Sequence, residues 1–308
     1  MKKLLTLSLA FVLSACNGQQ KSEKNTQIPL EKQVTYRLDL TMKVPHEVYI
    51  NDILIAQEFR NSNAGIDLNP YILKNGKYVV KLRLLPFSQY NEKLIRRKDI
   101  ENTALLFGTY TMDKESGKLI RSNVDKLLPI TVPKTDVPYF EQEWEVEITE
   151  LPYELEGWSN GQDLRKWDQK ELEKKVVAYY NKIRNILDNG DSEKWLNQIK
   201  HRFDETCIFD YLSKKRVTED LKEIKEDVEL YSKGTMIPLE DYEMKIYAEG
   251  KIVTLVRKTH TKEFNNYSPL DIKGWSPLIS KGEISGAAPY PILLYLPKGS
   301  DEFVIIRK

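Results

Sequence analysis

The stretch DQKELEKKVVAYYNKIRNILDNG, residues 168–190, decides the fold class. Its apolar side chains recur every three or four residues, which places them on one face of a helix. These side chains are Leu172, Val176, Tyr179, Ile183, Ile186 and Leu187. Asp168 is a typical N-terminal cap, and Asn189-Gly190 is a typical helix stop. The stretch therefore predicts an amphipathic helix.

The residues after this helix predict two more helices and then strands. Ser192 is the expected cap of a second helix, and Thr218 is the expected cap of a third. After Gly234 the pattern becomes strand-like at 242–247 and 251–258, around a Glu249-Gly250 turn. A last hairpin is predicted from 292–296 and 303–306.

Upstream of the helix the period of the apolar residues is two. Residues 36, 38, 40 and 42 are apolar and alternate with polar ones, as in a half-buried strand. Asn51-Asp52, Asn75-Gly76 and residues 113–117 predict turns between strands, with strand-like residues at 71–73 and 141–149 among others. The basic cluster at 96–98 is interpreted as a solvated turn. Short strands and regular turns indicate a β-sandwich.

Together these patterns predict an α+β chain with two domains. We expect a sandwich-like all-β domain at residues 34–155, and a helix-then-antiparallel-sheet domain at residues 156–308. Gly-rich and Trp-containing sequence around residues 152–168 marks the boundary between them.

The first residues predict export. Lys2 and Lys3 precede ten mostly apolar residues, a segment too short to cross a bilayer and typical of a cleaved signal peptide. The motif Leu13-Ser14-Ala15-Cys16 resembles the lipobox of bacterial lipoproteins. That resemblance implies cleavage after residue 15 and acylation of Cys16. It also implies an envelope location facing the periplasm, and Asn17 in place of Asp favours the outer membrane. Polar residues 16–33 then form a flexible tether.

Charge and residue types exclude several kinds of partner. Removing residues 1–15 takes two of the 47 basic residues and none of the 46 acidic ones, which leaves a formal charge of −1. This balance does not favour nucleic acid. Cys207 has no second cysteine for a disulfide once Cys16 is acylated, and we interpret it as a small buried residue. The three histidines lack metal-ligand spacing, and no glycine-rich phosphate loop occurs, so no metal or cofactor is predicted.

One motif has the form of a hydrolase nucleophile. Gly157-Trp158-Ser159-Asn160-Gly161 matches G-x-S-x-G, and His201 and His260 lie downstream. The elbow requires a buried strand before the serine, whereas Pro152 and two acids interrupt the preceding residues. We therefore interpret this motif as a linker turn and predict no enzymatic activity, with a hydrolase as the less favoured alternative.

The remaining candidate surface is residues 259–291, about 30 residues without a clear regular pattern. Its aromatic residues are candidates for a protein-binding face: Phe264, Tyr267, Trp275 and Tyr290. The alternative is that they cover the open end of the sheet.

The lipobox and the two-domain pattern predict a membrane-anchored binding protein. This profile resembles, by class and architecture, the immunity lipoproteins that protect bacteria from type VI secretion toxins. The resemblance implies a toxin as protein partner, neutralised by occlusion of its active site. The alternatives are an envelope structural or assembly lipoprotein and a periplasmic hydrolase.

Overall fold

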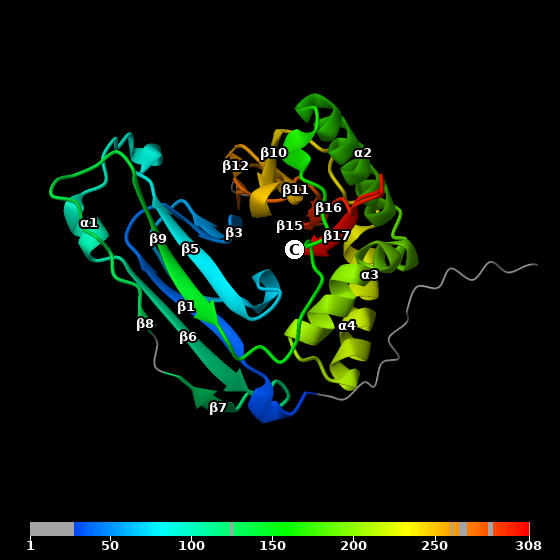
Figure 1. Cartoon of the computed structure of the whole chain (residues 1–308). Coiled ribbons are helices and arrows are strands. Elements are labelled where there is room, and N and C mark those ends of the chain that lie inside the picture. Colours follow the sequence, from blue (N-terminus) through cyan, green and yellow to red (C-terminus); the bar gives the residue numbers. More distant parts are fainter. Residues whose placement is uncertain (1–27, 124–125, 260, 265–269, 283–285, 308) are drawn as a thin grey trace, which may run out of the picture.

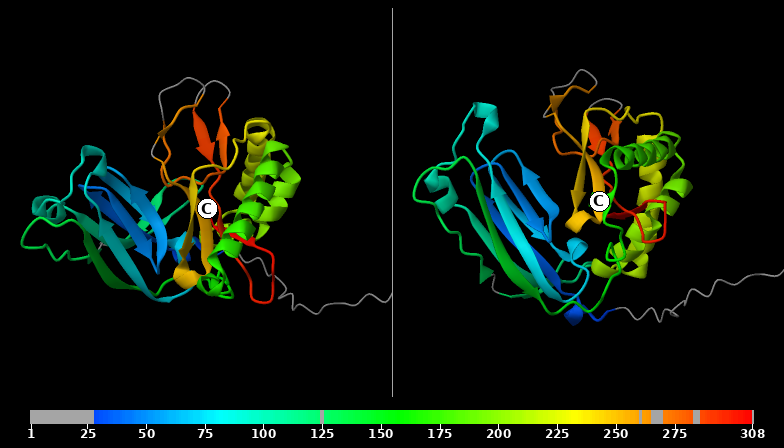
Figure 2. Two further views of the ribbon diagram at one scale, coloured as in Figure 1. Left: turned by 90° about the horizontal axis from the view of Figure 1, so that it is seen from above. Right: turned by 45° about the horizontal axis from the view of Figure 1, so that its top comes forward.

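The protein has an α+β fold, seen in a computed structural model that describes residues 28–123, 126–259, 261–264, 270–282 and 286–307 (Figure 1). We call residues 34–155 the N-terminal lobe and residues 156–307 the C-terminal lobe. The N-terminal lobe is built from strands, whereas the C-terminal lobe packs helices on one side of a smaller sheet (Figure 2).

Two antiparallel sheets face each other in the N-terminal lobe. The first has the order β4 (Ser62–Asp67), β1 (Thr35–Met42), β6 (Ala104–Met112), β7 (Leu119–Ser122), with β8 (Lys126–Leu127) also beside β6. The second has the order β3 (Ile53–Glu58), β2 (His46–Ile50), β5 (Gly76–Leu84), β9 (Phe140–Ile148). Alternate residues of both sheets, such as Leu38 and Leu82, meet in one buried core. The predicted sandwich-like arrangement of strands is confirmed.

The predicted turns follow from local chemistry. Asn51 and Asp52 have φ angles of 44° and 63°, as a tight hairpin between β2 and β3 requires.

Two details of the prediction for the N-terminal lobe are wrong. Residues 96–98 are not a turn, because Arg96 precedes the short helix α1 (Arg97–Glu101) and its Nε donates to Asp99 Oδ2 at 2.7 Å. Tyr71 lies in the 3-10 helix η2 (Asn69–Tyr71), not in a strand. The other 3-10 helices of this half are η1 (Leu30–Lys32) and η3 (Ser88–Tyr90).

The C-terminal lobe begins with the three expected helices. They are α2 (Gln169–Asp188), α3 (Ser192–Phe209) and α4 (Lys214–Glu226), with the 3-10 helix η4 (Leu164–Lys166) before them and the π-helix η5 (Asp227–Ser232) after them. Asp168 caps α2 as predicted, accepting hydrogen bonds from the backbone N–H groups of residues 170 and 171.

The other two caps differ from the prediction. Asp191, one residue before Ser192, accepts from Lys194 N and caps α3. Ser213 accepts from Arg216 N and caps α4. Thr218 lies inside α4, where its hydroxyl donates to Lys214 O. A carboxylate or hydroxyl satisfies free N–H groups only just before the first turn, so the earlier residue takes this role in both helices.

Helix α2 packs on an antiparallel sheet with the order β10 (Tyr242–Tyr247), β11 (Ile252–Arg257), β16 (Leu293–Tyr295), β17 (Val304–Arg307). The 3-10 helix η6 (Ala248–Gly250) joins β10 to β11. The fully buried Tyr180 of α2 ties the two layers together, because its hydroxyl donates to Ile292 O at 3.1 Å and accepts from Leu255 N at 3.0 Å. The predicted hairpins at both ends of this sheet are confirmed.

The segment 259–291 contains more regular structure than its sequence indicates. Two small hairpins form there: β12 (Thr261–Lys262) with β13 (Leu270–Asp271), and β14 (Ile279–Lys281) with β15 (Ala287–Pro289). Strands of two or three residues are too short for a periodic pattern, so the prediction of an irregular loop is wrong for this physical reason.

A buried ion pair of the C-terminal lobe lies against the N-terminal lobe. Arg307 Nη1 lies 2.6 Å from Glu205 Oε2, and the two side chains are only 3% and 8% exposed. Arg307 Nε also donates to Pro70 O in the N-terminal lobe, and Glu205 Oε1 accepts from Gly157 N. The guanidinium lies over the Trp158 ring as well. Burial lowers the pKa of Arg307, and the nearby Glu205 carboxylate opposes that shift.

Glu205→Leu removes the counter-charge from a guanidinium that stays buried, and we expect a loss of about 3 kcal/mol in the free energy of unfolding. Lys200→Ala is the matched control on the same helix, because Lys200 and Asp204 form an exposed ion pair. The control should lose less than about 1 kcal/mol. Urea unfolding followed by circular dichroism measures both, and equal losses would show that the Arg307 pair does not stabilise the fold.

Candidate functional site

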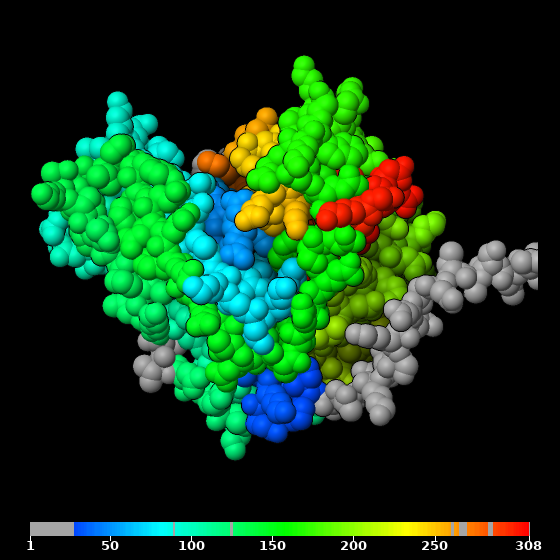
Figure 3. All heavy atoms as spheres, in the orientation of Figure 1, coloured from blue at the N-terminus to red at the C-terminus, as the bar shows by residue number. Residues whose placement is uncertain are grey.

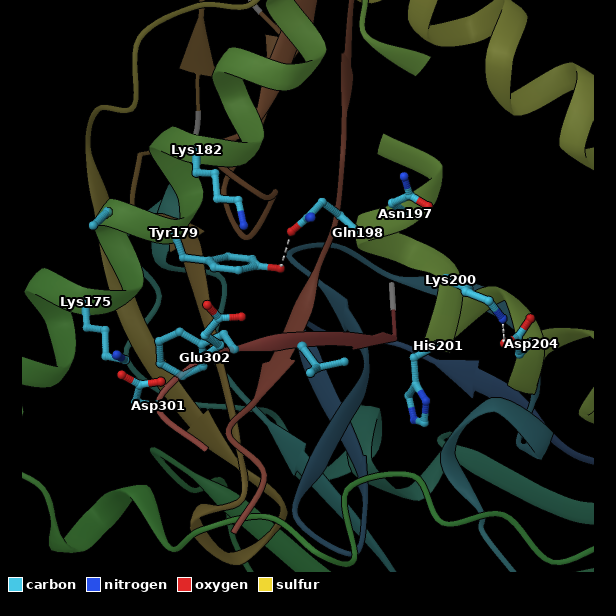
Figure 4. A pocket seen from close by; sticks show the side chains of 13 residues that line it. Lys175, Tyr179, Lys182, Asn197, Gln198, Lys200, His201, Asp204, Asp301 and Glu302 are labelled. Atoms are coloured by element: carbon cyan, nitrogen blue, oxygen red, sulfur yellow. Dashed lines mark hydrogen bonds and ion pairs between the residues drawn. The ribbon is translucent and has the colours of Figure 1, made fainter. Parts of the chain in front are cut away.

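Two grooves are candidates for a functional site. The first, which we call the helical groove, has a volume of about 670 Å³ and lies between α2, α3 and the residues that lead into β17 (Figure 4). The second, which we call the inter-lobe groove, has a volume of about 570 Å³ and lies between β3 and residues 271–275.

The helical groove has an aromatic base and charged walls. Tyr179 donates a hydrogen bond from its hydroxyl to Gln198 Oε1 at 3.1 Å, and Lys182 and Gln198 approach this ring from two helices (Figure 4). Lys182 Nζ lies 5.4 Å from the ring centre, and Phe303 packs against the ring edge-on. Burial, followed by the nearby Glu302 carboxylate, raises the pKa of Tyr179, so its hydroxyl remains a neutral donor.

Charges of both signs line the helical groove. Lysines from α2 and α3 are balanced by Asp204, Asp301 and Glu302, and Lys200 is already paired with Asp204 at 2.5 Å. A balanced and open surface of this kind suits a polar protein surface better than a small ion of one charge.

Both lobes contribute to the inter-lobe groove. Residues 54–60 of the N-terminal lobe form one wall, and residues 271 and 273–275 of the C-terminal lobe form the other. The walls touch at Phe59 and at Gly274. Lys273 Nζ lies 4.5 Å from the centre of the Phe59 ring, a cation–π contact. Gly274 lies against Gln57 so closely that a Cβ atom there would clash with Gln57 Oε1. In Figure 3 the surface is hollowed between the two lobes.

The structure gives the predicted protein-binding aromatics different environments. Trp275 lines the inter-lobe groove and also packs against the small core that contains Phe264. Phe264 is 4% exposed and packs with Ile272 and Ile279, so this side chain is buried and offers no binding surface. Tyr290 is half-buried, lies edge-on to Trp195 and shares a hydrogen bond with Ser232. Tyr267 lies outside the described residues, as does Cys16.

Ser159 lies in the turn that its sequence context indicates. Its hydroxyl donates to Glu156 O at 2.6 Å, and its own carbonyl accepts from Lys251 Nζ. Within the described ranges no hydrogen bond joins Ser159 to a histidine, and His260 lies outside them. His201 instead approaches Glu205, with His201 Nε2 3.7 Å from Glu205 Oε1. The Ser159 hydroxyl is thus used by a carbonyl of its own turn.

The remaining reactive groups are accounted for by packing. Burial, together with Asp204 and Asp220, raises the pKa of the half-buried Cys207 thiol to about 11, so the nucleophilic thiolate is disfavoured.

In the part of the chain that the structure describes, no group of three or more His, Cys, Asp or Glu side chains is placed to hold a metal ion. Among the same residues no helix is both long and apolar enough to cross a bilayer.

Comparison of the chain with protein-family models, with curated proteins and with solved structures finds no match. The candidate segment 259–291 contains one wall of the inter-lobe groove, residues 271 and 273–275, but sequence reasoning missed the other wall, residues 54–60, because the two walls are more than 200 residues apart in the chain. No local pattern signals such a contact.

Gly274→Ala tests the close contact between the lobes. Gly274 and Gly286 have φ angles of +80° and +79°, but only Gly274 has a neighbour that an added Cβ would displace. We expect about 1 kcal/mol of backbone strain from alanine at either position. For Gly274→Ala we expect a further loss of about 1 kcal/mol in the free energy of unfolding, because Gln57 must move and lose its hydrogen bond to Glu47. Urea unfolding of the two variants compares them, and equal losses would contradict a tight contact.

Proposed function

We propose that this chain is a lipid-anchored binding protein of the cell envelope, facing the periplasm, that captures a protein partner in the inter-lobe groove. The observation that supports the proposal is the groove itself. Its walls come from both lobes, and it combines the aromatic side chains of Phe59 and Trp275 with the cations of Arg60 and Lys273. Aromatic and arginine side chains are enriched where proteins bind each other.

We further propose that the partner is a secreted antibacterial toxin, and that binding neutralises the toxin by covering its active site. Covering an active site requires a rigid surface, and it does not require a catalytic group on this chain. The hydrogen bond from the buried Arg307 to Pro70 O supports rigidity between the walls, because separating the lobes would break this bond and expose the Arg307–Glu205 pair. The lipidated Cys16 would hold the protein where an incoming toxin acts.

Cys16→Ser tests the anchor. The variant keeps the export signal but lacks the thiol to which acyl chains are attached, and two or more chains are needed for stable membrane anchoring. We expect the wild-type chain in the membrane fraction and the variant in the soluble periplasmic fraction. Fractionation with immunoblotting measures this, and metabolic labelling with a fatty-acid analogue provides the chemical control. Unlabelled, soluble wild-type protein would contradict lipidation.

Trp275→Ala tests the groove. The tagged mature protein is first used to recover partners from its own cells, and a single stoichiometric partner encoded beside its gene is the expected result. Its affinity is then measured by calorimetry. Truncation of a central interface aromatic costs about 2 kcal/mol, or about 30-fold in Kd. Tyr231→Ala is the control, because Tyr231 is 65% exposed on η5 and lines neither groove.

The outcomes separate the two parts of the proposal. Recovery of no partner would contradict a binding role. Recovery of resident envelope machinery alone would contradict toxin neutralisation and favour an assembly role. Equal affinities of the two variants would place the binding face away from the inter-lobe groove.

A further inference from the structure

Strand β3 forms an outer edge of its sheet and faces the inter-lobe groove. Among the described strands it pairs with β2 and with no other. Every residue from Leu54 to Arg60 lines the groove, whereas a groove lying on one face of a sheet is lined by alternate residues. The groove therefore runs along the outer edge of β3. An edge strand leaves the backbone N–H and C=O groups on its outer side without a partner strand.

The register shows which backbone groups point outward. Asn51 N donates to Val79 O, and Leu85 N donates to Pro45 O, so the odd-numbered residues of β2 turn their backbone groups toward β5. The even-numbered residues His46, Val48 and Ile50 then face β3, opposite Glu58, Ala56 and Ile53.

Gln57 lies between two of these inward pairs, so its backbone N–H and C=O point away from β2. Within the described ranges neither group forms a hydrogen bond, although the Gln57 side chain donates to Glu47. The residues between Ile53 and Ala56 contain a bulge, so the regular pairing with β2 begins at Ala56. Within this regular part of β3, Gln57 is the residue whose backbone points outward.

The opposite wall leaves this edge open. The backbone of residues 273–275 is committed within its own lobe, because Gly274 N donates to Arg257 O and Arg257 N donates to Trp275 O. Across the groove the Phe59 ring contacts Lys273, and the Gln57 side chain contacts Gly274. The free backbone N–H and C=O of Gln57 thus lie in a groove with an aromatic and charged opposite wall.

We propose that the open edge of β3 binds an extended segment of a protein partner as an added strand. Only another extended backbone presents N–H and C=O groups with the spacing that this edge offers, and strand addition is a recurrent mode of peptide recognition. The segment pairs with β3 around Gln57, and its outward side chains contact Phe59, Lys273 and Trp275. This inference rests on the proposed function and names the partner's conformation at that site.

The first experiment selects dodecapeptides from a random phage-displayed library on the full mature protein. We expect selected peptides with β-branched or aromatic residues at alternate positions, and slowed hydrogen exchange of the Gln57 amide when a synthetic copy is bound. Helical peptides, protection confined to the helical groove, or no enrichment over an empty surface would overturn the proposal.

The second experiment compares Gln57→Pro with Gln57→Ala. Proline removes the outward N–H while the ladder to β2 keeps its bonds, whereas alanine keeps this N–H and loses only the side chain. We expect about tenfold weaker peptide binding for proline and less than about threefold for alanine. Equal affinities would overturn strand addition.

Two measurements keep the result interpretable. Circular dichroism and urea unfolding check that the proline variant folds. If the proline variant does not fold, protection of the Gln57 amide in the wild-type hydrogen-exchange experiment tests strand addition. A partner that binds normally to both Gln57 variants but not to Trp275→Ala would contradict strand addition and leave the proposed binding function standing.

Discussion

The buried pair of Arg307 and Glu205 is the constraint on which the rest of the structure depends. A guanidinium that is 3% exposed requires a counter-charge and hydrogen-bond acceptors, because burial of an unpaired charge is costly. Here the partners of Arg307 come from three separate parts of the chain: α3, the 3-10 helix η2 at Pro70 in the N-terminal lobe, and β17 itself. The guanidinium reaches its Pro70 acceptor only when both lobes are in place.

A second polar contact acts in the same region. Asn69 accepts from Tyr36 N and donates to Val34 O, and it also donates to Phe209 O at the end of α3. Tyr211 reaches across the lobes as well, and its hydroxyl donates to Val34 O at 2.6 Å. These bonds have specific geometry, whereas apolar packing alone tolerates sliding. The lobes therefore meet at a defined angle, and that angle sets the width of the inter-lobe groove.

Patterns within single elements were readable from the sequence, and contacts between elements were not. The period of residues 168–190 predicts α2, and Asn51-Asp52 predicts the β2–β3 hairpin, because helix and turn preferences act over a few residues. The caps of α3 and α4 were misplaced because several capping residues stand close together, and only the geometry selects one. Neither Glu205 on a charged helix nor Arg307 near the C-terminus carries a local sign of burial.

The aromatic residues of segment 259–291 show why a binding surface is harder to predict than an element. Phe264 and Trp275 both contact the same small core, yet the first is buried in it and the second also lines a groove. The difference comes from the β12–β13 and β14–β15 hairpins, which turn one ring inward. An apolar side chain can serve either role, whereas an unpaired backbone edge has only one kind of complement. For this reason the orientation of Gln57 in β3 is a more specific indicator of binding than the aromatic content of the segment that faces it.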